Sequence, residues 1–399
     1  MKHSADVVVI GGGIIGCATA AELAAAGADV VLVERREIAH GASGRNHGLL
    51  FYPQNEQTAP LYRRSHEMYR NLQASSEINI AFDEEPKGFI ILVAEESQWA
   101  PAQLEAEACA AGGVPVEKLD AKDLYEAEPA LAPGYLGGWL IVDGYRLDPG
   151  ALTVALAHRA RQIGAEVRTN EDVKQVLVRS GKTAGVVSDL GVISARTVVD
   201  AAGPWAPKVA RSAGTDLPIT GARGWLMLTR SVGPLANHLL ESSGWHLVAG
   251  DPGPGSVTVG EYGEGESNTR SEVGMLIQQN RSGHVLLGGS RLASLTEDPE
   301  GPEVPAEIAR RAAAALPALR NVPIAAVWSG VRPTSTDGLP LIGPVPEVEG
   351  LFVNGGHGGQ GVMLGGGSGS LASQLITGSE PFCDPGPFSP ARFPADTTN

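Results

Sequence analysis

A glycine-rich turn near the start of the chain has the spacing that a dinucleotide phosphate requires. Residues 11–16 are Gly-Gly-Gly-Ile-Ile-Gly and follow a short apolar run at 6–10. In such a motif Gly11 allows a tight turn, Gly13 lets the backbone approach a pyrophosphate, and Gly16 lets the following helix pack closely on the strand. The N-terminus of that helix presents free N–H groups and a positive dipole end to the phosphates. The pattern predicts a dinucleotide site.

Glu34 strengthens this prediction because it ends a second apolar run, at 29–33, where a carboxylate can bind ribose hydroxyls. A carboxylate at this position disfavours the 2′-phosphate of NADP, so NAD and FAD both remain open. The alternative is a glycine turn in an ordinary strand–helix–strand unit, which would not need the acid.

The segment after Glu34 favours FAD over NAD. Residues 35–49 are a glycine-studded run of small and polar side chains, where an NAD enzyme would have a third strand–helix unit. Such a loop can run along a flavin and donate backbone N–H groups to it. The stretch 42–48, Ala-Ser-Gly-Arg-Asn-His-Gly, resembles the same region of the D-amino-acid-oxidase superfamily of FAD-dependent amine oxidases and dehydrogenases, which includes glycine oxidase and sarcosine oxidase.

The resemblance continues along nearly the whole chain, in family elements that occur in the same order. They are Ala-Gly-Pro-Trp at 202–205, a hairpin at 276–290 similar to that of sarcosine oxidase β-subunits, Gly-Val-Arg-Pro at 330–333, Asp-Gly-Leu-Pro-Leu-Ile-Gly at 337–343, and a last strand ending in Gly-His at 356–357. Disulfide reductases fit less well, because they would show a redox cysteine pair.

The resemblance implies that the cofactor is FAD, bound noncovalently. Val173 falls where the family contacts the adenine through its backbone. His47 lies in a region that some relatives use for covalent attachment, but its register differs from that pattern. The cofactor contacts implied for this chain are Gly11, Gly13, Ile14, Ile15, Gly16, Glu34, Arg35, Ala42, Ser43, Arg45, Asn46, His47, Gly48, Val173, Ala202, Gly203, Trp205, Arg332, Gly356, His357, Gly358, Gly359, Gln360, Gly361 and Val362.

Arg332 is the strongest candidate for binding the substrate. A guanidinium can hold a carboxylate with two parallel hydrogen bonds and so fix the adjacent carbon over a flavin, as the resemblance to glycine oxidase implies. The alternative is a structural ion pair with an acid such as Asp337. His357 is expected to hydrogen-bond the flavin beside a helix N-terminus, where the reduced form concentrates negative charge. Its alternative role is only to hold the loop.

Tyr52 and Gln279 are further catalytic candidates. Tyr52, with Phe51, follows the first flavin loop and lines the predicted substrate cavity, unless both are core residues. Gln278 and Gln279 form a polar pair in an apolar strand, which predicts that at least one of them lines a wet cavity. No set of metal ligands is expected.

These residues predict FAD-dependent oxidation of an amine or amino acid by hydride transfer to the flavin, giving an imine that hydrolyses. One alternative is a 2-hydroxy-acid or polyol-phosphate dehydrogenase, which would need a base such as His357 to take the hydroxyl proton. Another is the flavin subunit of a heteromeric dye-linked dehydrogenase. The expected electron acceptor is oxygen or a quinone-like carrier, and a homo-oligomer or a partner subunit remains open.

The composition excludes other kinds of partner. Lys+Arg number 30 and Asp+Glu number 45, a net charge of −15, and no basic block occurs, which argues against nucleic-acid binding. No apolar run reaches the ~18 residues of a membrane span. Cys17, Cys109 and Cys383 lie far apart, which argues against a cysteine zinc site and a secreted disulfide framework. Without a targeting segment, a cytoplasmic protein is expected.

The predicted helices and strands that position these residues indicate an α/β plus α+β fold. In this fold a Rossmann-like FAD-binding domain carries an inserted substrate domain, which is built on a mixed or antiparallel sheet. Asp148 is expected to cap a helix that runs to Ile163. Apolar spacing predicts a helix at 362–376, although Gly365–Gly369 has the composition of a flexible linker. The expected segments are 1–80, 145–220 and 330–380 for the FAD domain, 81–144 and 221–329 for the substrate domain, and 381–399 for a proline-rich, extended tail.

Overall fold

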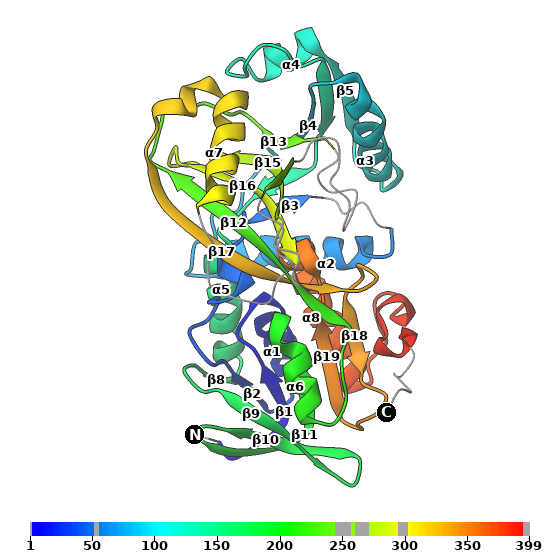
Figure 1. The fold of residues 1–399 in the computed structure, drawn as a ribbon. Coiled ribbons are helices and arrows are strands. Elements are labelled where there is room, and N and C mark those ends of the chain that lie inside the picture. The colour runs from blue at the N-terminus through cyan, green and yellow to red at the C-terminus, as the bar shows by residue number, and fades with distance from the viewer. Residues whose placement is uncertain (1, 52–55, 244–256, 260–270, 294–301, 394–399) are drawn as a thin grey trace, which may run out of the picture.

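A computed structural model shows the fold and describes residues 2–51, 56–243, 257–259, 271–293 and 302–393. In this part of the chain, two large sheets follow one another along the length of the molecule, and helices pack against both (Figure 1). Strands from near both ends of the described chain belong to the first sheet (Figure 1). The predicted fold class, a nucleotide-binding sheet joined to a second and largely antiparallel sheet, is confirmed.

The first sheet contains a parallel core. Its strands are β1 (Ser4–Ile10), β2 (Val30–Val33), β8 (Glu166–Arg168), β9 (Val173–Arg179), β10 (Lys182–Ser188), β11 (Gly191–Asp200), β18 (Leu341–Pro344) and β19 (Leu351–Gly355). The main path runs β18-β19-β11-β1-β2-β8, with β1 parallel to both β2 and β11. Because the strand order reverses at β1, its carboxyl end is a switch point, where open α/β sheets bind ligands.

Helices and a hairpin bury both faces of this sheet. The helices are α1 (Ile14–Ala25), α2 (Ala59–Ser75), α5 (Pro149–Gln162), α6 (Ala206–Ser212) and α8 (Gly361–Thr377). Val7 and Val9 of β1 belong to the core formed with α1, α2, α5 and α8, whereas Val8 and Ile10 belong to the core formed with α6 and β9–β10. Successive strand residues point to opposite faces, so a strand covered on both faces is apolar throughout.

Helix α8 contains the glycine-rich stretch, as predicted. A Cβ at Gly367 would overlap the carbonyl oxygen of Leu61 in α2, and a Cβ at Gly369 would come 2.7 Å from the carbonyl carbon of Ala18 in α1. The glycines therefore let three helix backbones approach one another closely. In the structure they serve packing, and the linker-like composition of 365–369 does not produce a linker.

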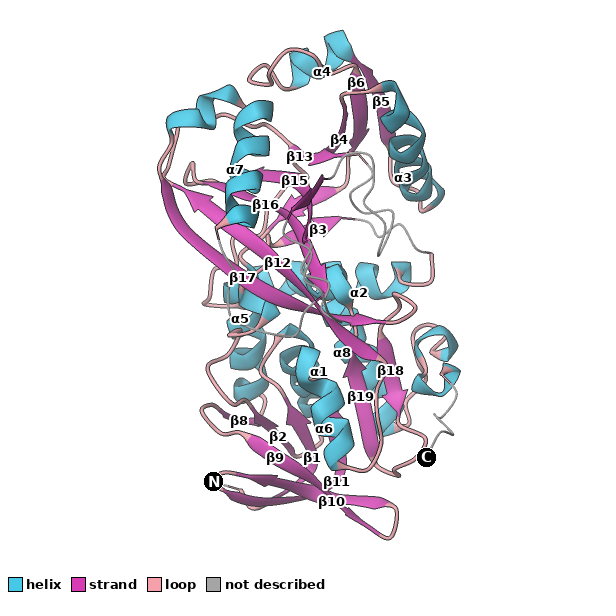
Figure 2. Ribbon diagram, in the orientation of Figure 1, coloured by secondary structure: helices cyan, strands magenta, loops and turns pink. Residues whose placement is uncertain are grey.

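The second sheet lies beyond the first (Figure 2). Its strands are β4 (Phe89–Val93), β5 (Val116–Asp120), β6 (Gly137–Ile141), β12 (Ile219–Thr229), β13 (Leu239–Ser242), β14 (Val257–Val259), β15 (Ser271–Gln279), β16 (Val285–Ala293) and β17 (Ile324–Ser335). The path runs β17-β12-β16-β15-β13-β4-β6-β5, with β14 beside β15. The pair β13–β4 is parallel, and β15–β16 form the predicted antiparallel hairpin.

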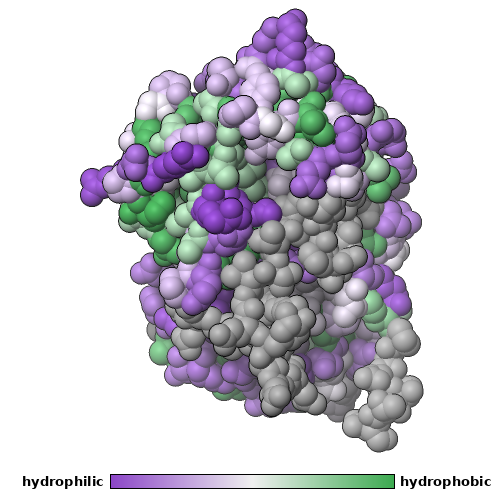
Figure 3. Space-filling view, turned by 45° about the horizontal axis from the view of Figure 1, so that its top comes forward, coloured by the Kyte–Doolittle hydropathy of each residue, from purple (hydrophilic) through white to green (hydrophobic). Residues whose placement is uncertain are grey.

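Three helices and a small two-stranded ribbon complete this half of the molecule. They are α3 (Trp99–Ala111), α4 (Ala121–Ala127), α7 (Glu303–Ala315) and the ribbon of β3 (Leu49–Phe51) with β7 (Gly144–Arg146). Hydrophilic residues cover the top of the molecule in the space-filling view, and hydrophobic residues lie in patches between them (Figure 3). None of the helices in the described residues combines the length and apolar character needed to cross a membrane.

Two expectations about organisation need adjustment. The border expected at residue 330 falls inside β17, and the border expected at 221 falls inside β12, so we assign both strands whole to the proposed substrate domain. The tail is not simply extended, because residues 386–388 and 390–392 form 3₁₀ turns η6 and η7. Phe388 of the tail is buried in the core that contains α8, which holds this segment against the first sheet.

Candidate active site

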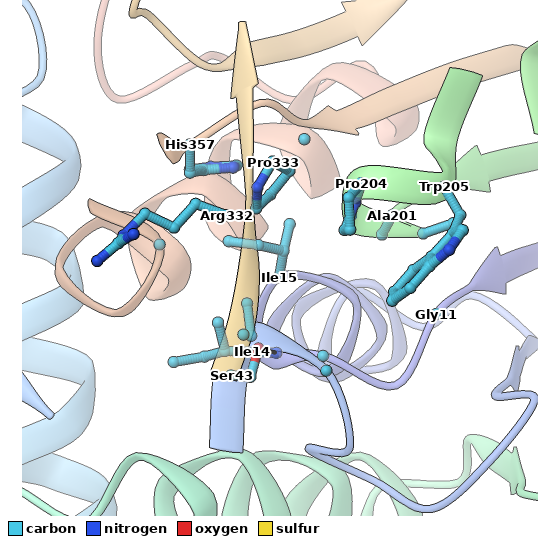
Figure 4. A pocket seen from close by; sticks show the side chains of 18 of the residues that line it. Gly11, Ile14, Ile15, Ser43, Ala201, Pro204, Trp205, Arg332, Pro333 and His357 are labelled. Atoms are coloured by element: carbon cyan, nitrogen blue, oxygen red, sulfur yellow. Dashed lines mark hydrogen bonds between the residues drawn. The ribbon is translucent and has the colours of Figure 1, made fainter. Parts of the chain in front are cut away.

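A cavity of about 410 Å³ opens at the carboxyl end of β1 and extends to the second sheet. In the close view, Trp205 and Pro204 lie on one side of the cavity, Arg332 and His357 on the other, and Ile14 and Ser43 between them (Figure 4). The predicted cofactor contacts that line it are Gly11, Gly13, Ile14, Ile15, Glu34, Arg35, Ala42, Ser43, Arg45, Asn46, His47, Val173, Ala202, Gly203, Trp205, Arg332, His357, Gly358, Gly359, Gln360, Gly361 and Val362.

Three predicted cofactor contacts lie behind the cavity wall. A Cβ at Gly16 would overlap the carbonyl oxygen of Gly11, and a Cβ at Gly48 would overlap that of Leu147. Gly356 has a φ of +76°, in the left-handed region that favours glycine. These glycines shape the turns that form the wall, whereas residues next to them in the chain line the cavity.

The turn between β1 and α1 can hold an anionic group. Gly11 has a φ of +113°, and a Cβ there would overlap the carbonyl oxygen of Ala201. The first turn of α1 itself contains no acidic side chain, and its residues Ile14 and Ile15 line the cavity, so the positive dipole end of the helix lies at the cavity wall. The N–H of Ile14 donates to Ser43 Oγ at 2.9 Å, which ties this turn to the loop at 42–48. This arrangement suits a pyrophosphate.

Glu34 lies at the end of β2 and is oriented by the backbone. Its Oε2 accepts from the N–H of Gly12 at 2.6 Å, and its Oε1 accepts from the N–H of Arg36 at 2.8 Å. Each carboxylate oxygen has a second acceptor position, so Glu34 can still receive hydrogen bonds from ribose hydroxyls. Next to it, the Arg35 guanidinium stacks 3.8 Å from the centre of the Trp205 ring, across the same end of the cavity.

The loop after Glu34 is fixed by its own side chains. Residues 42–44 form the 3₁₀ turn η1. Asn46 Nδ2 donates to the carbonyls of Ala42 and Ser43 at 2.9 Å each, and Asn46 Oδ1 accepts from Gly48 N–H at 2.8 Å. Arg45 joins this loop to β17 by donating to the Ser329 carbonyl at 3.2 Å. The loop therefore bridges the two sheets beside the cavity.

Arg332 of β17 points into the cavity without an acidic partner among the described residues. Its Nη1 donates to the carbonyl of Ser290 at 3.1 Å. Burial, and to a lesser degree the charge of nearby Arg291, lower the pKa of Arg332 to about 10, so the guanidinium is cationic at neutral pH. The alternative of an ion pair with Asp337 is wrong, because Asp337 pairs with Arg392 of the tail at 2.7 Å.

His357 is buried at the start of the 3₁₀ turn η5 (Gly358–Gln360), which leads into α8. Its Nε2 lies 2.9 Å from Ser368 Oγ, and its Nδ1 is buried without a hydrogen-bond partner in the described structure. Burial lowers the pKa of His357 to about 3, so the imidazole is neutral at neutral pH. The neighbouring Asn354 also has a buried, unpartnered Oδ1. Unpartnered polar atoms in a cavity wall fit a site that binds a polar cofactor.

The structure removes Gln279 from the candidate catalytic residues. Its Oε1 accepts from the N–H groups of Leu235 and Ala236 at 2.7 and 3.1 Å, and its Nε2 donates to the carbonyls of Gly233 and Gly283 at 2.9 and 3.1 Å. The loop backbone thus uses all the polar groups of Gln279. Neither Gln279 nor Gln278 lines the cavity.

Tyr52 lies outside the described residues. Its neighbour Phe51 lines the cavity and stacks on Phe89 with ring centres 5.3 Å apart. Sequence reasoning missed Arg291, Lys174 and Lys208, which also line the cavity. Arg291 follows the Gly-Gly-Ser at 288–290, which was a usable signal, whereas the two lysines stand in unremarkable contexts.

Comparison with known proteins agrees with this geometry. The chain is 28% identical to a glycine oxidase of Pseudomonas putida over 97% of this chain and 98% of the other. It is 32% identical to subunit A1 of an anaerobic glycerol-3-phosphate dehydrogenase of Haloferax volcanii, over 59% of this chain and 43% of the other. The crystal structure of glycine oxidase from Geobacillus kaustophilus superposes with a TM-score of 0.85 at 26% identity, covering 99% of this chain and 100% of that one.

A family model described as "DAO: FAD dependent oxidoreductase" matches residues 6–375, which include the second sheet, the first sheet from Asp6 on and every residue of the cavity wall. FAD therefore accounts for the phosphate-binding turn and for the buried polar atoms in the cavity wall. The chain belongs to the DAO family of FAD-dependent oxidoreductases.

Proposed function

We propose that the protein oxidises the carbon–nitrogen bond of a small amine or amino acid that carries a carboxylate, similar to glycine, sarcosine or a D-amino acid. The observation that carries this proposal is Arg332, a cation that reaches into the cofactor cavity and has no acidic partner among the described residues. The glycine oxidase relatives, which match the chain over nearly its full length, support it. FAD supplies the hydride acceptor, and the imine product hydrolyses in water.

In this proposal Arg332 fixes the substrate by its carboxylate. Nη1 of Arg332 donates to the Ser290 carbonyl, so Nε and Nη2 remain to donate two parallel hydrogen bonds to the substrate carboxylate. A carboxylate held in this way keeps the adjacent carbon in one position over the cofactor, which is the contribution of orientation to catalysis.

His357 serves as a neutral hydrogen-bonding group. Ser368 orients its ring through Nε2, and the ring can present Nδ1 to the cofactor. A histidine with a pKa of about 3 is a weak base at neutral pH. This argues against the dehydrogenase of 2-hydroxy acids or polyol phosphates, which would need His357 to remove a hydroxyl proton, although one relative is a glycerol-3-phosphate dehydrogenase subunit.

We further propose that FAD is bound noncovalently and that the protein works in the cytoplasm with oxygen or a quinone-like carrier as electron acceptor. The wide spacing of Cys17, Cys109 and Cys383, which form no disulfide among the described residues, supports a reducing compartment. Acid precipitation of the yellow protein checks the attachment: noncovalent FAD leaves a colourless pellet, and a yellow pellet would point to a covalent bond such as one through His47.

One experiment tests the proposed reaction directly. The purified yellow protein is mixed without oxygen with glycine, sarcosine, D-alanine, an alkylamine, glycolate and glycerol 3-phosphate. Bleaching by the amino acids, and not by glycolate or glycerol 3-phosphate, is expected. Bleaching by the hydroxy compounds alone would refute amine oxidation. Admitting air afterwards shows whether oxygen restores the colour, and tagged pull-down shows whether a partner subunit is needed.

A further inference from the structure

The substrate end of the cavity is built on an irregular part of the second sheet. The register of β12 against β16 shifts between Arg223 and Met227, and the register of β16 against β15 shifts between Gly288 and Ser290. Gly224 and Gly289 lie in these stretches and line the cavity. Irregular pairing of this kind occurs next to active sites, where it changes the direction of side chains.

The backbone conformation at Gly224 does not require glycine. It is not among the glycines with a positive φ, and it pairs in register with Gly330 inside a long strand. Glycine in a strand interior is unfavourable unless something approaches closely. Here a Cβ would come 2.8 Å from Nη2 and 2.9 Å from Cζ of Arg332, and closer still to Nη1. The guanidinium occupies the space that a side chain at 224 would take.

The contacts of Arg332 show why this space matters. Arg332 is two residues beyond Gly330, so its side chain crosses diagonally over Gly224 to the next strand. There Nη1 donates to the Ser290 carbonyl, and Ser290 Oγ accepts from the N–H of Trp225 at 2.8 Å. The guanidinium is therefore held between the bare backbone of β12 and a carbonyl of β16.

We propose that Gly224 is a positioning residue for substrate binding: its missing side chain seats the Arg332 guanidinium on the Ser290 carbonyl, with Nε and Nη2 directed to a small carboxylate. This proposal rests on the proposed role of Arg332 in binding the carboxylate. A methyl group at 224 meets the mobile end of a side chain rather than backbone, so it displaces the guanidinium and leaves the strand in place.

The test compares Gly224→Ala with the wild-type holoenzyme. The control is Gly233→Ala, because Gly233 has no atom within 4 Å of an added Cβ and no positive φ. Acetate, a carboxylate that cannot be oxidised in this way, is titrated against the visible spectrum of bound FAD, and acetamide is the neutral counterpart. We expect Gly224→Ala to weaken acetate binding about 10- to 100-fold, the effect of losing one hydrogen bond to a charged group, and to leave acetamide binding unchanged. The control matches the wild type.

A double-mutant cycle with Arg332→Ala separates positioning from a general need for glycine. If Gly224 acts through the guanidinium, Gly224→Ala has no further effect on acetate affinity or on melting temperature once Arg332 is replaced. A Gly224→Ala variant that is equally unstable in both backgrounds would refute the proposal, as would unchanged acetate binding in Gly224→Ala beside weakened binding in Arg332→Ala. An acetate affinity that neither substitution changes would instead refute the proposed role of Arg332.

Discussion

At the scale of single residues, Arg332 and His357 come from different parts of the chain and meet in one cavity. Both have pKa values lowered chiefly by burial, but the consequences differ. The arginine remains charged at neutral pH and can bind an anion, whereas the histidine becomes neutral and can only share a hydrogen bond. In the proposed reaction Arg332 therefore binds the substrate, and His357 contacts the cofactor.

Replacing Arg332 by Met should remove the carboxylate site and keep much of the side-chain volume. We expect KM for an amino-acid substrate to rise about 100-fold or more, the equivalent of about 3 kcal/mol for a bidentate charged contact. Steady-state kinetics with an amino acid and with an alkylamine that has no carboxylate measure the effect. The alkylamine serves as the internal control and should change little. Equal kinetics of variant and wild type on the amino acid would count against the proposed substrate class.

The pH dependence of turnover checks the neutral state of His357. Its pKa is lowered to about 3, so its ring gains a proton only in strong acid and is neutral throughout the range from pH 5 to 8. We expect that His357→Gln lowers kcat at every pH in this range by a similar factor. An inflection near pH 6.5 that is present in the wild type and absent in the variant would show that His357 titrates normally.

At the scale of elements, α8 shows how a helix can be rich in glycine and still be a helix. Glycine lowers intrinsic helix stability by about 1 kcal/mol per residue relative to alanine, so the sequence composition alone argues against this helix. The close contacts of Gly367 with α2 and of Gly369 with α1 offset that cost. The N-terminus of α8 is thereby placed beside the cavity, where Gly361 and Val362 form part of the wall.

Gly367→Ala should therefore destabilise the protein although alanine favours helices. The added methyl group would overlap backbone atoms of Leu61 within α2 rather than the end of a flexible side chain, and the expected loss is about 1–3 kcal/mol of unfolding free energy. Thermal unfolding of the holoprotein measures it. The matched control is Gly150→Ala in the first turn of α5, where the new Cβ meets only the Asp148 carboxylate at 3.3 Å. A Gly367 variant as stable as this control would disprove the packing argument.

At the scale of the whole molecule, a buried ion pair connects the chain segment that follows α2 to the second sheet. Asp83 is 1% exposed and accepts from Arg146 Nε at 2.8 Å and from Arg281 Nη2 at 3.4 Å. Arg146 belongs to β7 and also donates to the carbonyl of Gln279 at the end of β15. The carboxylate therefore holds a segment after α2 against the second sheet.

Asp83→Ala should lower the free energy of unfolding by about 3–5 kcal/mol, because it leaves the largely buried Arg146 charge without its partner. Denaturant unfolding of the holoprotein provides the measurement. Asp216→Ala is the control, since Asp216 pairs with Arg211 on the exposed surface and should contribute little. If both variants had the same unfolding midpoint, the ion pair would not stabilise the packing of this segment on the second sheet.

Many structural features of this molecule are predictable from the sequence, because they depend on residues that are close together in the chain. The turn at 11–16, the apolar strand before it, Glu34 and the cap of α5 by Asp148 all follow from local backbone and burial preferences, and the structure has them. The helix at 362–376 was predictable from apolar spacing, but the reason for its glycines was not. That reason lies in α1 and α2, which are distant in sequence.

The sequence by itself determined the cofactor-binding turn, the strands and helix around it, the helix at 362–376, and the arginine and histidine proposed for the site. Only the tertiary structure decided which partners those side chains have. Asp337 forms an ion pair with Arg392, and Gln279 hydrogen-bonds the backbone of a loop. Arg332 lies over Gly224, and His357 is buried and neutral. The physical reason is that a local pattern fixes backbone conformation and the buried face, whereas hydrogen-bond partners and desolvation depend on chain segments that pack together only in the folded molecule.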